Sequence, residues 1–99
     1  MFDVRITVMK VASYPDLIER YELPQGLPCL MKEGMSFVSK AAKMPEGFCE
    51  NAWPSLSPFV EELAQGGGHF YGEWMKDPSK AMISCNDGFR PVSFLLERV

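Results

Sequence analysis

One long apolar stripe at helical spacing constrains the fold of this chain most. Its members fall four, seven, eight and eleven residues after the first, and therefore share one helix face: Ala52, Leu56, Phe59, Val60 and Leu63. The stripe predicts a main helix over 51–65, with Asn51 as N-cap. Pro58 lacks an interior N–H donor, so we expect a bend or a restart near Ser57. Three consecutive glycines at 66–68 predict where the helix ends.

Shorter patterns predict four strands. Apolar and polar residues alternate over 2–8, which predicts the first strand, and Met35–Ser39 predicts a second with Phe37 toward the core. Two final strands, Lys80–Cys85 and Pro91–Val99, flank the turn signal Asn-Asp-Gly at 86–88 and should form an antiparallel hairpin. We expect Asp87 to bond the turn backbone and to pair with Arg90.

A second, short helix is predicted between the first two strands. Ser13 stands at the N-cap position, Pro15 lies in the first turn, and Pro24 ends the segment. Four residues at helical spacing form an apolar face that should pack on the sheet: Tyr14, Leu17, Ile18 and Tyr21.

The elements together predict an α+β fold over residues 1–99, in the order β-α-β-α-β-β. A chain of 99 residues is the size of one domain. Two helices should cover one face of a four-stranded, largely antiparallel sheet. A second apolar surface is expected on the other face, and a homodimer would cover it. Its expected members are Met9, Val11, Met82 and Leu95.

Charge and apolar patterning exclude several classes of partner. The net charge is −3 with interspersed signs, which disfavours nucleic-acid binding because a phosphate backbone requires a basic face. Apolar runs of a few residues are too short to cross a membrane. The first 13 residues carry three charged side chains within the apolar pattern, unlike a signal peptide, so we expect a cytoplasmic protein.

Three cysteines and the single histidine form one candidate site. Cys29, Cys49, Cys85 and His69 would make a Cys₃His set suited to zinc, although no two of them have the close spacing of structural zinc ligands. Cys49 precedes the main helix, where the helix dipole can activate a thiol, and Cys85 with His69 would make a nucleophile and base. The competing interpretation is that the cysteines are small buried apolar residues.

Aromatic residues near the glycines form the other candidate site. Trp53, Phe70, Tyr71 and Trp74, with His69, are the candidate ligand-binding residues, and the segment 66–72 would act as a lid. An ordinary loop folded over the core edge would have the same composition. The glycines are not a phosphate loop, because they end a helix instead of opening one.

The cysteine and turn positions resemble an uncharacterised family of small prokaryotic single-domain proteins. The shared features begin with Cys29, Gly34, Phe37 and Cys49, and continue with the glycines at 66–67 and Trp74. They end in Cys-x-Asp-Gly-x-x-Pro-Val-x-Phe at 85–94, so the resemblance covers nearly the whole chain. It implies a cytoplasmic protein of bacteria or archaea and no particular chemistry.

The sequence therefore favours a small non-enzymatic binding or accessory module without a cofactor. The aromatic loop 69–75 would hold a small molecule or a protein partner. One histidine and no paired acidic motif leave few routes to a catalytic site, yet enzymatic activity stays open. The alternative is a thiol-based metal site, with zinc bound by the cysteines, or a redox site.

Overall fold

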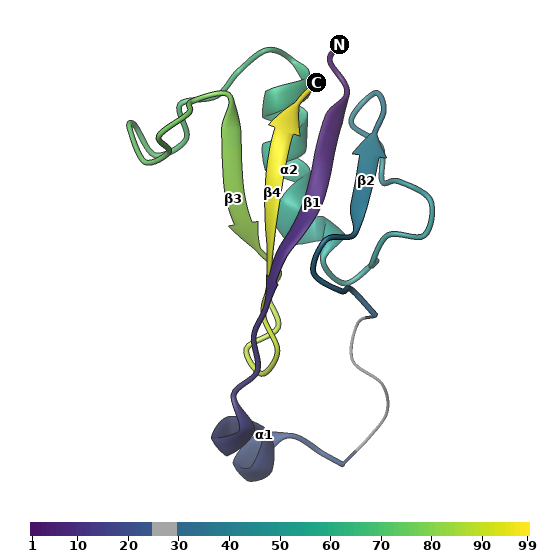
Figure 1. Ribbon diagram of the computed structural model, residues 1–99, viewed down its shortest axis with the longest axis vertical. Helices are drawn as coiled ribbons and strands as arrows, with labels where there is room; N and C mark the ends of the chain where they lie inside the picture. The colour runs from purple at the N-terminus through teal and green to yellow at the C-terminus, as the bar shows by residue number, and fades with distance from the viewer. Residues whose placement is uncertain (25–29) are drawn as a thin grey trace.

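The computed structural model describes residues 1–24 and 30–99. Within them the elements are β1 (Val4–Val11), α1 (Pro15–Tyr21), β2 (Ser36–Ser39), α2 (Trp53–Ala64), β3 (Lys80–Ser84) and β4 (Val92–Arg98). The four strands form one antiparallel sheet in the order β2-β1-β4-β3 (Figure 1). The predicted α+β fold and element order are thus confirmed.

The core lies between the sheet and α2, which runs along one sheet face (Figure 1). The predicted stripe of α2 faces inward: Ala52, Leu56, Val60 and Leu63 are buried, and Phe59 is half-buried at its edge. Alternate residues of the strands meet them, as period-two alternation requires. The buried strand residues are Val4, Ile6, Val8, Ala81, Ile83, Val92, Phe94 and Leu96.

The main helix starts later than predicted and ends where the glycines predict. Ala52, and not Asn51, is the N-cap, and the helix continues through Pro58 without a restart. At the other end Gly66 has a φ of 91°. Its N–H bonds the Leu63 carbonyl at 3.0 Å, and the Gly67 N–H bonds the Glu62 carbonyl at 2.8 Å. This pair of bonds is a Schellman motif, which glycine at the left-handed position makes possible.

The short helix α1 does not pack on the sheet, contrary to prediction. None of its residues is buried, and it projects beyond the end of the sheet (Figure 1). Tyr14 occupies the N-cap position predicted for Ser13 and makes no side-chain capping bond. Backbone bonds explain the placement, because the Ala12 and Tyr14 N–H groups each donate over 2.9 Å to carbonyls of the β3–β4 loop, those of Pro91 and Phe89.

The β3–β4 turn is organised by Asp87, and Arg90 has a different partner from the one predicted. Asp87 Oδ1 accepts the backbone N–H groups of Phe89 and Arg90 at 2.8 and 3.1 Å, as expected for Asp in a turn. The Arg90 guanidinium pairs instead with Glu22, just after α1, at 2.8 Å. The pair ties α1 to the hairpin loop.

The apolar surface predicted on the outer sheet face is present only in part. Met82 and Leu95 are cross-strand partners on this face, whereas Val11 pairs with Val92, whose side chain belongs to the core. Beside them Lys80 and Glu97 form a salt bridge at 3.1 Å, so charged side chains interrupt the apolar residues. Among the described residues, no helix combines the length and apolar character needed to cross a membrane.

Candidate aromatic binding site

Four aromatic side chains from α2 and the following loop form a connected group, here called the aromatic cluster: Phe59, Phe70, Tyr71 and Trp74. The Phe59 ring lies 5.2 Å from that of Phe70 and 6.1 Å from that of Tyr71, centroid to centroid. Tyr71 and Trp74 meet edge to face at 5.2 Å. These spacings are typical of favourable aromatic pairs. The structure therefore brings together three of the aromatic residues predicted for the site.

The fourth predicted aromatic residue, Trp53, lies elsewhere. It is the first residue of α2, and its ring contacts that of Phe48 at 5.9 Å. The cluster begins at Phe59, six residues further along α2, which is about 9 Å along the helix axis. Trp53 consequently packs at the edge of the core and does not belong to the aromatic cluster.

The loop backbone is held in an unusual conformation under the cluster. His69 and Tyr71 have φ values of 55° and 52°, in the left-handed region that non-glycine residues rarely adopt. The following Gly72 also has a positive φ, of 77°. The turn leaves the Tyr71 side chain 75% exposed and that of Trp74 48% exposed. Two large rings are thus held in solvent by a backbone that costs energy to form.

The base of the loop is closed by contacts between its two ends. The His69 N–H donates to the Pro78 carbonyl at 3.1 Å. Gly68 lies so close to this carbonyl that a Cβ at position 68 would collide with it. Beyond the closure, Asp77 Oδ1 accepts the Ser79 hydroxyl at 2.7 Å and the Ser79 N–H at 2.9 Å. These two hydrogen bonds, the hydroxyl first, hold the pKa of Asp77 below its ordinary value.

Arg98, near the end of the chain, anchors the start of the loop. Its Nη1 donates to the carbonyls of Leu63 and Gly67 at 3.0 and 2.5 Å, and its guanidinium lies 5.3 Å from the centre of the Phe2 ring. Sequence reasoning missed this residue. Its only sequence signal is a single cation in the last strand, opposite a helix end without basic residues of its own.

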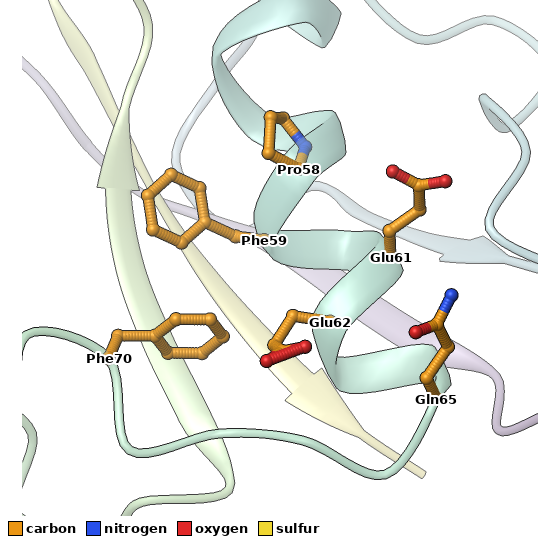
Figure 2. A pocket seen from close by; sticks show the side chains of 6 residues that line it. All are labelled: Pro58, Phe59, Glu61, Glu62, Gln65 and Phe70. Carbon is orange, nitrogen blue, oxygen red and sulfur yellow. The ribbon is translucent and has the colours of Figure 1, made fainter.

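An open hollow of about 410 Å³ adjoins the cluster. It is lined by Pro58, Phe59, Glu61, Glu62, Gln65 and Phe70, so five of its six residues come from α2 or the residue after it (Figure 2). Figure 2 shows the Phe59 and Phe70 rings on one side, the Glu61 and Gln65 side chains on the other, and the Glu62 carboxylate between them. The hollow therefore combines aromatic carbon with carboxylate oxygen.

His69 lies at a smaller hollow. This second space, of about 270 Å³, is lined by residues of the loop itself: His69, Gly72, Glu73, Met75, Lys76 and Pro78. The predicted ligand residues are thus divided, with Phe70 at the larger hollow and His69 at the smaller. The segment 66–72, predicted as a lid, is held at its start, where Gly68 lies against the Pro78 carbonyl and the Gly67 carbonyl accepts a hydrogen bond from Arg98.

The two cysteines that the structure describes pack against the core. Cys49 and Cys85 are half-buried free thiols packed against the core, and Cys85 Sγ accepts the Val92 N–H at 3.3 Å. Cys29 lies outside the described residues. Across 1–24 and 30–99, no group of three or more His, Cys, Asp and Glu side chains is placed to hold a metal ion. The structure therefore does not favour the predicted metal site.

No protein-family model, curated protein or solved structure matches this chain. The resemblance to a small prokaryotic family accordingly stays a prediction. What the chain does must be argued from its own geometry, in which the aromatic cluster and the larger hollow are the most distinctive features.

Proposed function

We propose that this protein is a small binding module whose binding surface is the aromatic cluster together with the adjoining hollow. The observation that carries the proposal is the exposure of Tyr71 and Trp74 on a closed, left-handed loop. Strained backbone persists where surrounding structure enforces it, and such positions gather at functional sites. Exposed aromatic rings add apolar area that solvent alone would not favour and that a ligand can bury.

A small organic molecule fits this surface better than a protein partner. The hollow of about 410 Å³ is comparable in volume with small-molecule sites of about 300–1,000 Å³, but it is open to solvent and would leave much of a ligand exposed. Its lining of two aromatic rings and several polar groups also has the mixed character of such sites. The proposal requires no catalytic step and no cofactor.

Thermal unfolding in the presence of defined compounds tests the proposal. A ligand that binds only the folded state raises the midpoint of unfolding by mass action. The probes are choline, 3,3-dimethylbutan-1-ol, indole and benzoate. At least one should raise the midpoint of the wild type, and the effect should disappear in the triple variant Phe70→Ala, Tyr71→Ala, Trp74→Ala, which removes one ring of the hollow and both exposed rings.

Leu30→Ala is the matched control, because Leu30 is 70% exposed, close to the 75% of Tyr71, and belongs neither to the aromatic cluster nor to α1. It should keep the full response to the probe. A probe response that survives loss of Phe70, Tyr71 and Trp74, or no response to any of the four probes, would contradict the proposed function.

We also propose that α1 packs against a second copy of the chain. The helix projects from the sheet without a buried residue, although its face carries Tyr14, Leu17, Ile18 and Tyr21. Bonds from Ala12 and Tyr14 and the Glu22–Arg90 pair hold it in place, so an apolar face is presented on a fixed support. Light scattering after size exclusion should give twice the chain mass of 11.2 kDa.

A charge on this face should separate the copies. Leu17→Glu should give a monomer, whereas Met44→Glu should not, although Met44 is exposed to the same degree, 39% against 37%. A wild type that has the mass of one chain at every concentration would rule the dimer out.

A thiol-based site is less well supported than a binding module. Cys49 and Cys85 pack against the core, and the Cys85 sulfur already accepts a backbone hydrogen bond. An odd number of widely spaced cysteines fits a reducing compartment, so we place the protein in the cytoplasm. The preference for a binding module over a thiol-based site would be wrong if elemental analysis of purified protein found stoichiometric zinc and if chelators released it together with reactive thiols.

A further inference from the structure

We infer that the larger hollow binds a small organic cation carrying a quaternary ammonium group. The inference rests on the proposed function, since it names the ligand class for the same surface. Three features of the described residues support it: the charge of the lining, the two aromatic rings in it and the place of the Glu62 carboxylate beside them.

The charge around the hollow is negative. Glu61 and Glu62 both line it, and its lining, taken over the described part of the chain, contains no Lys or Arg. Glu61 and Glu62 belong to the last turns of α2, and its last turn holds no basic residue. The carbonyl end of a helix also carries a partial negative charge. Arg98 offsets part of that charge at the Leu63 and Gly67 carbonyls, but it is not among the lining residues.

The aromatic side of the hollow suits an alkylated ammonium group. The Phe59 and Phe70 rings meet at 5.2 Å with an interplanar angle of 62°, so they present differently oriented surfaces to the same space. Cations are attracted to aromatic faces, and quaternary ammonium ligands are the best-known case. Such a group also has apolar methyl surface to bury against the rings, which a primary ammonium group lacks.

Gly67 leaves room for the Glu62 side chain beside the turn. An added Cβ on Gly67 would lie only 2.5 Å from Glu62 Cδ and 2.7 Å from its Oε2. The Glu62 side chain thus occupies the space that a side chain at 67 would need. Gly67 is a positioning residue, because its missing side chain lets the carboxylate lie against the turn and beside the rings (Figure 2).

The experiment compares choline with its neutral isostere, 3,3-dimethylbutan-1-ol, by NMR titration of the folded protein. The two probes have the same shape and differ in the charge at one atom. Choline should bind at least about fivefold more tightly, the size expected for a cation–π contact supported by a carboxylate. The backbone amide signals of residues 58–65 and 70 should move, and added salt should weaken the binding of choline more than that of the alcohol.

Three substitutions separate the contributions. Phe70→Leu keeps apolar volume but removes a ring face, and Glu62→Gln keeps shape but removes a charge; each should weaken choline binding severalfold and change binding of the alcohol little. Gly67→Ala should displace Glu62 and act in the same direction as Glu62→Gln. Glu46→Gln, an exposed glutamate outside the lining, is the matched control and should leave choline binding unchanged.

The outcomes distinguish this inference from the proposed function. Equal binding of the two probes at the hollow, or tighter binding of the alcohol, would overturn the cation inference and leave the binding surface intact. Loss of choline binding in Glu46→Gln to the same extent as in Glu62→Gln would also overturn it, since general charge would then suffice. Absence of any shift at residues 58–74 with either probe would count against both.

Discussion

Arg98 connects the last strand to the end of α2 by hydrogen bonds. Its Nη1 donates hydrogen bonds to the carbonyls of Gly67 and Leu63, which lie 31 and 35 positions earlier in the chain. Arg98→Ala should lower the free energy of unfolding by about 1–2 kcal/mol, because two helix-end carbonyls lose a charged donor at a partly exposed site. Urea unfolding measures this change, and hydrogen exchange at the Gly66 and Gly67 amides should become faster.

Arg5 provides the comparison for Arg98. It lies exposed on β1, and its removal should change the free energy of unfolding by no more than about 0.5 kcal/mol. Equal effects of Arg5→Ala and Arg98→Ala would show that the helix-end bonds contribute nothing specific.

Asp77 makes the loop base sensitive to acid. Its pKa is lowered by the Ser79 hydroxyl first and by the Ser79 N–H second, so the folded state favours the charged carboxylate. The contribution to stability is therefore complete at neutral pH and is lost as the pH falls through the lowered pKa. Ser79→Ala should raise the pKa of Asp77 toward its ordinary value, as followed by carboxyl ¹³C NMR.

Ser84→Ala is the control for this titration. The Ser84 hydroxyl donates to the Cys85 carbonyl and touches no carboxylate, so its loss should leave the pKa of Asp77 in place. If Ser79→Ala left the pKa of Asp77 unchanged, the Ser79 hydroxyl would not be the cause of the lowered pKa.

At the residue scale, local chemistry was predictable and long-range partners were not. Asp87 in an Asn-Asp-Gly turn bonds the backbone within three residues, so its role follows from the sequence. Arg90 reaches Glu22, 68 residues earlier, and Arg98 reaches Leu63. Nothing in the neighbouring sequence identifies such partners, because they depend on how the elements come together.

The junction between α2 and the aromatic loop is the element that most limits substitution. Gly68→Ala places a methyl group against the Pro78 carbonyl, so the two ends of the loop must separate and weaken the His69–Pro78 bond. We expect a loss of about 1–3 kcal/mol in the free energy of unfolding, measured in urea.

Gly88→Ala tests whether any glycine in a loop would behave this way. An added Cβ at position 88 meets nothing within 4 Å, and the expected change is within about 0.5 kcal/mol. If Gly68→Ala were as harmless as Gly88→Ala, the loop base could not be held as closely as the structure indicates.

The elements differ in how far the sequence predicts them. The buried face of α2 follows from apolar spacing alone, and its end follows from Gly66 and Gly67, since both signals are local. The placement of α1 does not follow, because its apolar face suggests packing on the sheet while backbone bonds from Ala12 and Tyr14 hold it beyond the sheet. Amphipathic spacing predicts a face but not what the face meets.

For the molecule as a whole, the main point is that the predicted aromatic residues lie in two separate places around α2. The aromatic loop was located correctly because its rings follow the helix-ending glycines within a few residues. Trp53 was grouped with them wrongly, since proximity along the chain is not proximity in space when a helix intervenes. The two tryptophans therefore lie in different surroundings, one with Phe48 and one with Tyr71.

This separation gives the most direct test of the aromatic cluster as the binding surface. The two indole N–H groups give two NMR signals, which the variant Trp53→Phe assigns. On titration with choline, the Trp74 signal should shift with saturation, because its ring contacts that of Tyr71, which in turn contacts Phe59. The Trp53 signal should stay in place. A saturating shift of the Trp53 signal with Trp74 unmoved would show that choline binds near the start of α2 and not at the aromatic cluster.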